Sequence, residues 1–285
     1  MDNFDSLFEN QNTGFDSNQP FDKEAWAERK QAQRAQLYET IDSMADKTLS
    51  NPAALSDYLS MQSRLGRVSV SNTLLVKAQK PDASYIMSFD DWHQRGRSVN
   101  RNEKALLILE AGGEYERVDG TMGTSFDVKR VFDVSQTHGQ PLRERTQAPI
   151  RARLKALATD TPVPIRVSDS VSQEIGALYS GKDNTIYVAR NMDGGALFFT
   201  VARELTRVEH GGDTFICDCA ANIACLRYGI PARLCDRIPK EITALDVSEK
   251  RAVLGSIREA ACDIIERMDR HLYAERQQQK NQPER

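Results

Sequence analysis

Apolar residues recur at helical spacing through much of the chain and give way to strand-like runs at intervals. In the first half, the pattern predicts helices over 22–45, 53–65 and 69–79. Runs typical of strands occupy 84–88, 104–111 and 128–137. The Gly-rich stretch from Gly112 to Gly123 is expected to be a loop between the last two.

In the second half, the same reasoning predicts helices over 150–158, 196–209 and 214–228, with further helices to about residue 273. Strands are expected at 165–169, 175–180 and 185–190, and the sequence GKDN between the last two indicates a hairpin. The resulting expectation is an α+β protein of two domains, covering residues 23–137 and 150–273. The remaining segments are read as an acidic disordered tail (1–22), a Pro- and charge-containing linker (138–149) and a second disordered tail (274–285).

Composition narrows the class of protein. A chain of 285 residues can bury two cores, and it contains neither a secretion signal nor an apolar run long enough to cross a membrane. The five cysteines are odd in number, which favours reduced thiols in a cytoplasmic protein. Cys217 and Cys219 lie two apart on a predicted helix and therefore face different ways, so we expect buried small residues there and no metal clamp.

Charge is distributed unevenly along the chain. The net charge is −3, but residues 1–22 contain five acidic residues and no lysine or arginine. Residues 61–104 contain eight basic residues against four acidic ones, which would suit a phosphate backbone or an ordinary mixed-charge surface. The acidic tail also contains four phenylalanines, so it would either stay passive, dock on a partner or compete with DNA for a basic groove.

The segment from about residue 55 to 137 resembles the N-terminal single-stranded-DNA-binding domain of the ArdC-like antirestriction family, whose members travel on conjugative plasmids and transposons. Asn102 stands where that family usually has glycine, which would alter one turn. The matching positions are Ser71, Asn72, Gln79, Trp92, Gly96, Arg97, Val99, Glu103, Lys104 and the run 131–137.

Single strands are bound by basic side chains that neutralise phosphates and by aromatic rings that stack on bases. On this basis the ring of Trp92, Tyr85 or Phe89 would stack on a base. A tryptophan after a strand is also a common core residue. The alternative role for Asn72 and Gln79 is to form hydrogen bonds with local backbone groups. For each of the basic residues, DNA contact and a solvated surface position are the two open interpretations. The candidate nucleic-acid-binding residues are Asn72, Lys77, Gln79, Trp92, Arg95, Arg97, Arg101 and Lys104.

The sequence FFTVARELTRVEHGG places Arg203 and Arg207 where the zinc-binding motif H-E-x-x-H has histidines. The second half resembles the zincin-like metallopeptidase domain of the same family, and that resemblance puts Asp218 at the acidic ligand position. A guanidinium has no lone pair to give a metal, and Glu204 and Asp218 supply two carboxylates at most.

We therefore expect a degenerate zincin site (Arg203, Glu204, Arg207, Asp218) with no metal, no cofactor and no catalytic residue. Both arginines would pair with Glu204, Asp218 or Glu209, so that Asp218→Ala would destabilise the domain. An ordinary amphipathic surface helix is the alternative.

Together these features predict a cytoplasmic single-stranded-DNA-binding protein of a mobile element, which protects transferred DNA or counters restriction. Single-stranded DNA is the expected partner and a host restriction or relaxosome protein a second candidate, with no role for a membrane. Two alternatives remain: a metallopeptidase with an atypical site, and a protein-interaction scaffold that acts on host or relaxosome proteins.

Overall fold

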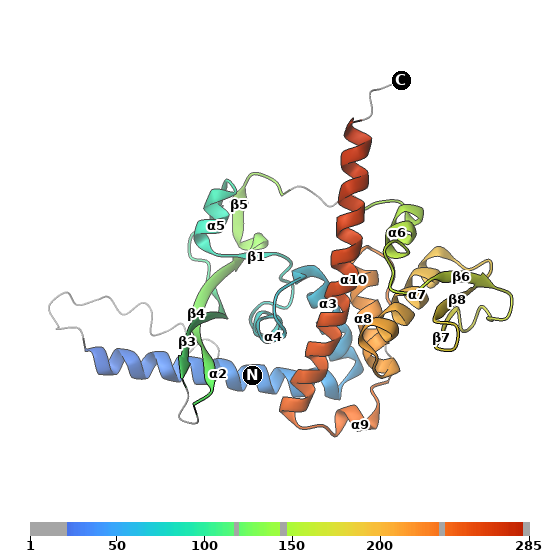
Figure 1. Cartoon of the computed structure of the whole chain (residues 1–285). Helices are drawn as coiled ribbons and strands as arrows, with labels where there is room; N and C mark the ends of the chain where they lie inside the picture. The colour runs from blue at the N-terminus through green and yellow to red at the C-terminus, as the bar shows by residue number, and fades with distance from the viewer. Residues whose placement is uncertain (1–21, 117–119, 143–146, 234–236, 282–285) are drawn as a thin grey trace. The chain divides into compact units, whose positions relative to one another are not determined.

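The structure is a computed structural model, and it describes residues 22–116, 120–142, 147–233 and 237–281. The expected tail 1–22 therefore lies outside the described residues except for Asp22. The chain divides into two compact units, unit 1 (Met1–Lys47 and Ser71–Leu142) and unit 2 (Thr48–Val70 and Arg143–Arg285). Each combines helices with a small sheet, which confirms the α+β class (Figure 1). Residues 48–70, inside the expected first domain, cluster with unit 2.

Unit 1 is built on a three-stranded antiparallel sheet in the order β1-β4-β3 and a smaller antiparallel pair, β2 and β5. Its core consists of apolar residues from α2, α4, β3 and β4, with Trp92 of α5 completely buried. The elements that contribute to it are α2 (Lys23–Ser50), α4 (Val70–Gln79), β1 (Ile86–Met87), α5 (Phe89–Gln94), β2 (Arg97–Val99), β3 (Leu106–Glu116), β4 (Met122–Asp133), the 3-10 helix η1 (Val134–Gln136) and β5 (Thr137–Gly139).

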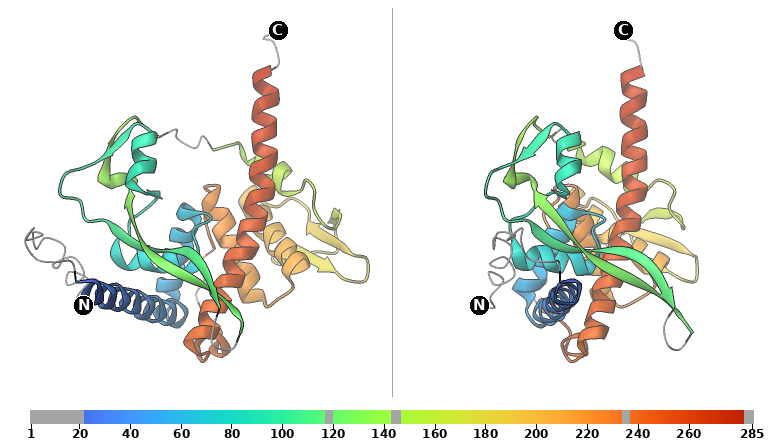
Figure 2. Two further views of the ribbon diagram at one scale, coloured as in Figure 1. Left: turned by 60° about the vertical axis from the view of Figure 1, so that its left-hand side comes forward. Right: turned by 90° about the vertical axis from the view of Figure 1, so that its left-hand side faces the viewer.

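Strands β3 and β4 form a long ribbon, visible in green in both views of Figure 2. The sequence predicted a loop from Gly112, but pairing continues to Glu116 and Met122 across a bulge between Ala111 and Glu114. A Cβ on Gly112 would lie 2.7 Å from the Ser125 hydroxyl, so glycine lets the two strands stay close at this irregularity.

Asp133 joins the start of β1 to the end of β4. The side chain is buried, and it accepts hydrogen bonds from the backbone N–H groups of Ser84 (2.7 Å), Tyr85 (3.0 Å) and Ser135 (2.9 Å). Burial by itself would raise the pKa of Asp133, but the hydrogen bonds from Ser135, Tyr85 and Ser84 outweigh it and hold that pKa below its usual value. Asp133 therefore fixes the segment that carries Tyr85.

Unit 2 contains the sheet β6-β8-β7, in which β6 is parallel and β7 antiparallel to β8. The predicted hairpin is confirmed, since Ser180 of β7 pairs with Thr185 of β8. The elements of the unit are α3 (Pro52–Leu65), α6 (Ile150–Leu157), β6 (Ile165–Ser168), β7 (Ala177–Ser180), β8 (Thr185–Ala189), α7 (Gly194–His210), α8 (Thr214–Arg227), α9 (Lys240–Thr243) and α10 (Val247–Asn281).

Helix α7 lies between the sheet and the other helices of unit 2. It packs on β7 and β8 and on α8, while α8 packs in turn on α3 and α10. Cys217 and Cys219 of α8 are fully buried, as expected from their sequence context, whereas Cys235 lies outside the described residues.

Helix α10 extends further than the sequence suggested. Residues 274–281, expected to belong to a disordered tail, continue the helix to Asn281. Its last turns extend past the neighbouring helices of the unit (Figure 2). The sequence AERQQQKN consists mostly of residues with good helix propensity, and it follows a packed helix, so no new nucleation step is needed.

Candidate functional site

Two candidate DNA-binding residues, Asn72 and Gln79, are used inside unit 1. Each side-chain amide forms a pair of hydrogen bonds with one residue of β3, as a neighbouring strand would. Asn72 donates to the Leu109 carbonyl and accepts from the Leu109 N–H, both at 2.8 Å. Gln79 makes the same pair with Leu107, also at 2.8 Å. Because α4 turns twice between these positions, both amides face the edge of β3 and cover it.

Trp92 and Arg97 are also engaged within unit 1. The Trp92 ring is 0% exposed and its Nε1 donates to the Phe132 carbonyl at 2.9 Å, so it presents no face on which a base could stack. Arg97 donates from Nε to the Thr137 hydroxyl (2.8 Å) and from Nη2 to the Thr137 carbonyl (2.9 Å). The contacts of Arg97 tie β2 to β5. The burial of Trp92 corrects its assignment as a stacking residue.

The remaining candidates differ in exposure. Arg95, Arg101 and Lys104 are exposed, whereas Lys77 is half-buried. Arg95 lies with its guanidinium carbon 5.9 Å from the centre of the Tyr85 ring. Tyr85 is 36% exposed and packs edge-on against Trp92 at 5.7 Å between ring centres.

Phe89 opens α5, is 55% exposed, and follows the Ser88 residue that caps the helix. Tyr85, Phe89 and Arg95 are therefore the exposed aromatic and basic candidates of the segment 85–95, and they are named here the α5 surface. Asn102, whose departure from the family's usual glycine was expected to alter one turn, has a φ of 63°. Asparagine tolerates this left-handed conformation, so the turn before Lys104 keeps a glycine-like backbone.

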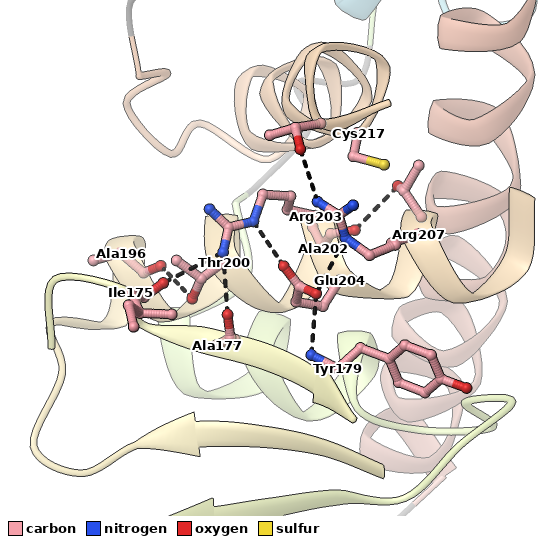
Figure 3. Close-up of polar contacts among 12 residues, drawn as sticks. Ile175, Ala177, Tyr179, Ala196, Thr200, Ala202, Arg203, Glu204, Arg207 and Cys217 are labelled. Atoms are coloured by element: carbon pink, nitrogen blue, oxygen red, sulfur yellow. Dashed lines mark hydrogen bonds and ion pairs between the residues drawn. The ribbon is translucent and has the colours of Figure 1, made fainter. Parts of the chain in front are cut away.

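In unit 2, Glu204 lies at the centre of a buried ion-pair cluster on α7 (Figure 3). Its side chain is only 3% exposed. Arg203 Nε lies 2.9 Å from Glu204 Oε1, and Arg207 Nε lies 3.4 Å from Oε2. The backbone N–H of Tyr179 also donates to Oε2 at 3.1 Å. Both arginines thus pair with one of the three acidic residues that were expected as partners, and the alternative of an ordinary surface helix does not hold.

The same cluster covers the outer edge of β7. Arg203 Nη2 donates to the carbonyls of Ala177 (3.1 Å) and Ile175 (3.3 Å), while Glu204 accepts from Tyr179. Figure 3 shows the guanidinium of Arg203 and the carboxylate of Glu204 lying along the strand, where an added strand would otherwise form its ladder. The side chains of α7 therefore occupy main-chain groups that an extended peptide would need. Sequence reasoning missed these backbone partners because no motif marks them.

Asp218 is the other acidic member of the cluster, but none of the described residues forms an ion pair with it. Its Oδ1 is buried and accepts no hydrogen bond from the described residues. Burial raises the pKa of Asp218, with Arg203 and Arg207 acting in the opposite direction and the negative charge of Glu204 adding to the increase. Burial also raises the pKa of the neighbouring Cys217 thiol.

Glu209 does not join the cluster either. It forms an ion pair with Arg267 of α10, and both side chains are largely buried. His210, at the C-terminal end of α7, lies 3.0 Å from Asp263 through its Nε2. Of the three expected partners, Glu204, Asp218 and Glu209, it is therefore Glu204 that pairs with both Arg203 and Arg207.

These residues do not fit a divalent metal ion. Both Glu204 oxygens are already engaged by cations, and neither arginine offers a lone pair. A thiol whose pKa is raised is a poor thiolate donor. Among the residues that the structure describes, no group of three or more His, Cys, Asp or Glu side chains is arranged to hold a metal. Within the same described ranges, every helix is too short or too polar to cross a membrane.

Comparison with known proteins gives matches at the level of structure. No family model matches the chain, and no curated protein sequence matches it. The metal-free crystal structure of the antirestriction protein ArdC from the R388 plasmid has a TM-score of 0.47 and 19% identity, and the match covers 81% of this chain and 96% of that one. The Mn(II)-bound structure of the same protein has a TM-score of 0.43 and 17% identity, with 77% and 97% covered.

Proposed function

We propose that the chain is a single-stranded-DNA-binding protein of a conjugative element, which protects the transferred strand or counters restriction in the cytoplasm. The observation that carries the proposal is the α5 surface, where two exposed aromatic rings lie on the segment that also presents Arg95. Stacking on such rings is worth about 1–3 kcal/mol per base, and it discriminates unpaired bases from a duplex. Arg101 and Lys104 follow in the next turn and add positive charge for phosphates.

In this proposal the α5 surface replaces the stacking role first given to Trp92. Asn72, Gln79 and Arg97 have structural roles in it, because they hold β3, β2 and β5 in place. Binding would then be largely independent of sequence, since neither rings nor arginines on phosphates read base edges.

The proposal assigns unit 2 no peptidase activity. Its support is the state of Glu204, whose Oε1 accepts from Arg203 and whose Oε2 accepts from Tyr179 and forms an ion pair with Arg207, so that neither oxygen is available to polarise a water. Metal analysis of the purified protein after dialysis against Zn(II) or Mn(II) tests this part. We expect far less than one equivalent, and a stoichiometric ion would contradict the assignment.

The DNA-binding surface is tested with Phe89→Ala and Arg95→Glu, measured as affinity for a labelled single strand. We expect Phe89→Ala to weaken binding about tenfold, the loss of one stacked base. Arg95→Glu should also reduce the dependence of affinity on salt, because fewer counterions are released. Tyr38→Ala and Arg29→Glu on α2, which alter an exposed ring and an exposed cation elsewhere in unit 1, serve as matched controls. Equal affinities for all four variants would exclude the α5 surface.

A further inference from the structure

The sheet of unit 2 has one edge that a helix covers and one that is open. Its order is β6-β8-β7, so β7 and β6 are the two edge strands (Figure 1). Side chains of α7 occupy the main-chain groups along the outer edge of β7. No described residue pairs with the outer edge of β6. An open edge of this kind is a template on which another strand can pair.

The main-chain groups at the open edge belong to Ile165 and Val167. The Pro164 carbonyl accepts from the Ile186 N–H at 2.9 Å, so it points toward β8. Because these groups alternate along a strand, those of Arg166 point toward β8 as well, in agreement with the parallel register. The N–H and C=O groups of Ile165 and Val167 therefore point away from the sheet. Within the described part of the chain, neither residue has a strand or loop to bond with on that side.

A row of apolar side chains crosses the sheet and ends at the same edge. Ala177, Val188 and Val167 are register partners on the three strands. Ala177 is 0% exposed and Val188 is 6% exposed, whereas Val167 is 58% exposed. The row therefore has no neighbour beyond β6, and an apolar side chain on an added strand would complete it.

Strand β6 is complementary to itself in one antiparallel register. A two-fold axis at Val167 would place this residue opposite its own copy, with N–H to C=O bonds in both directions. Arg166 would then lie opposite Ser168, and Ile165 opposite Asp169. A shift to one neighbouring register would bring Arg166 directly opposite its own copy, and a shift to the other would bring Val167 opposite Asp169. Since like charges directly opposite each other are destabilising, the register with Val167 on the axis is the favoured one, and it alone joins the two apolar rows.

We propose that β6 pairs with β6 of a second copy of this chain, in an antiparallel contact with Val167 on the two-fold axis. The two three-stranded sheets then form one continuous sheet across the axis. Because β6 has only four residues, the contact belongs with the small, weak interfaces, and the dimer should dissociate on dilution. It uses no residue of the α5 surface, so it is tested separately from the DNA binding proposed for unit 1.

Sedimentation velocity of the full chain between about 1 and 100 µM tests this contact. We expect a dimer at the upper concentration and a monomer at the lower one. Val167→Lys and Val167→Glu should each give a monomer throughout, because each places two like charges opposite one another. An equimolar mixture of these two variants should dimerise again, because opposite charges then face each other across the axis.

Leu178→Lys and Leu178→Glu are the matched controls. Leu178 is an apolar residue of the same sheet with a similar exposure of 51%, but it lies on β7, away from the β6 edge. Both control variants should dimerise as the wild type does. Both residues are more than half exposed, so the new charges stay solvated in the monomer, and unchanged melting temperatures check that every variant is folded.

A wild-type protein that stays monomeric at about 100 µM would overturn the proposal and leave the β6 edge to an extended segment of another protein. A dimer that persists in both Val167 variants would place the interface elsewhere and refute it. If each Val167 variant is monomeric and their mixture is too, the two copies of Val167 do not face each other. Loss of the dimer in the Leu178 controls would likewise exclude a contact specific to the β6 edge.

Discussion

The two acidic residues of the α7–α8 cluster lie in different surroundings, since Glu204 is buried and Asp218 is half-buried. Glu204 is held by two guanidinium groups and a backbone amide, whereas the buried Oδ1 of Asp218 accepts no hydrogen bond from the described residues. A paired buried charge stabilises only while its partners remain, and an unpaired carboxylate costs free energy whenever it is ionised.

Glu204→Gln should therefore destabilise unit 2 by about 3 kcal/mol, because it leaves Arg203 and Arg207 without their counter-charge. Urea denaturation at neutral pH measures the free energy of unfolding. Asp183→Asn, which changes an exposed carboxylate of the β7–β8 turn, is the control and should shift it little. A loss no larger than that of the control would show that the cluster does not stabilise the unit.

Asp218→Asn should change the free energy of unfolding in the opposite direction. Burial raises the pKa of Asp218 in the folded state, so its stability contribution is present below the unfolded pKa of about 3.9 and is lost as pH rises through the folded pKa. At neutral pH the substitution removes that cost, and the variant should melt at or above the wild-type temperature. The sequence alone suggested destabilisation by Asp218→Ala, on the assumption that Asp218 was in an ion pair. A lower melting temperature for Asp218→Asn would restore that view.

Asp133 should show the usual carboxylate behaviour. Its pKa is lowered in the folded state, so its contribution is present above the unfolded pKa of about 3.9 and is lost as pH falls through the folded pKa. Asp133→Asn replaces one acceptor oxygen by a donor facing the N–H of Ser84, Tyr85 or Ser135. The free energy of unfolding of unit 1 should fall by about 2 kcal/mol at pH 7 and by less at pH 3. An equal loss at both pH values would rule out the ionised carboxylate as the cause.

At the scale of elements, each unit covers a sheet edge with side chains from a helix. The amides of α4 cover β3, and the Arg203–Glu204 pair of α7 covers β7. An exposed edge invites pairing with another chain, and covering it prevents this. In both units, polar residues that the sequence placed in a candidate site satisfy main-chain groups of a strand.

Asn72→Ala and Gln79→Ala should therefore lower the stability of unit 1 and should not remove a contact with DNA. Each removes two hydrogen bonds to β3, at a cost of about 2 kcal/mol. Thermal melting and self-association of the double variant measure the effect, with the exposed Gln94→Ala as control. If the double variant has the melting temperature of the wild type but a lower affinity for single strands, the two residues contact DNA instead.

The helices and strands were largely predictable because their periodicity and caps are local signals. The hairpin at 177–189 and the ion pairs of α7 follow from neighbouring residues, and both were expected. The partners of Asn72 and Gln79 were not, since they lie 37 and 28 residues away and no pattern marks which strand faces α4. Burial of Trp92 was open for the same reason: its ring is covered by residues that only the fold brings together.

At the scale of the whole molecule, basic residues outnumber acidic ones in unit 2 and not in unit 1, for which DNA binding is proposed. Unit 2 has 24 lysine and arginine residues against 21 acidic ones, while unit 1, with the acidic tail, has 14 against 20. The phosphate binding proposed for unit 1 would therefore depend on a local group of cations, and the acidic tail would oppose it at long range.

Deletion of residues 1–20 removes Asp2, Asp5, Glu9 and Asp16 and leaves Asp22, which caps α2 through Glu24 and Ala25. Affinity for a single strand should rise severalfold at low salt and converge with that of the full chain at high salt, because the effect is electrostatic. A gain that persists at high salt would indicate direct competition by the tail.

The most direct test of the account is the anisotropy of a labelled single strand and of a duplex of equal length, each titrated with the full chain at two salt concentrations. The account predicts tighter binding to the single strand, because only unpaired bases can stack on Tyr85 and Phe89, and weaker binding at the higher salt. No binding to either at low salt, or equal binding to both, would contradict it.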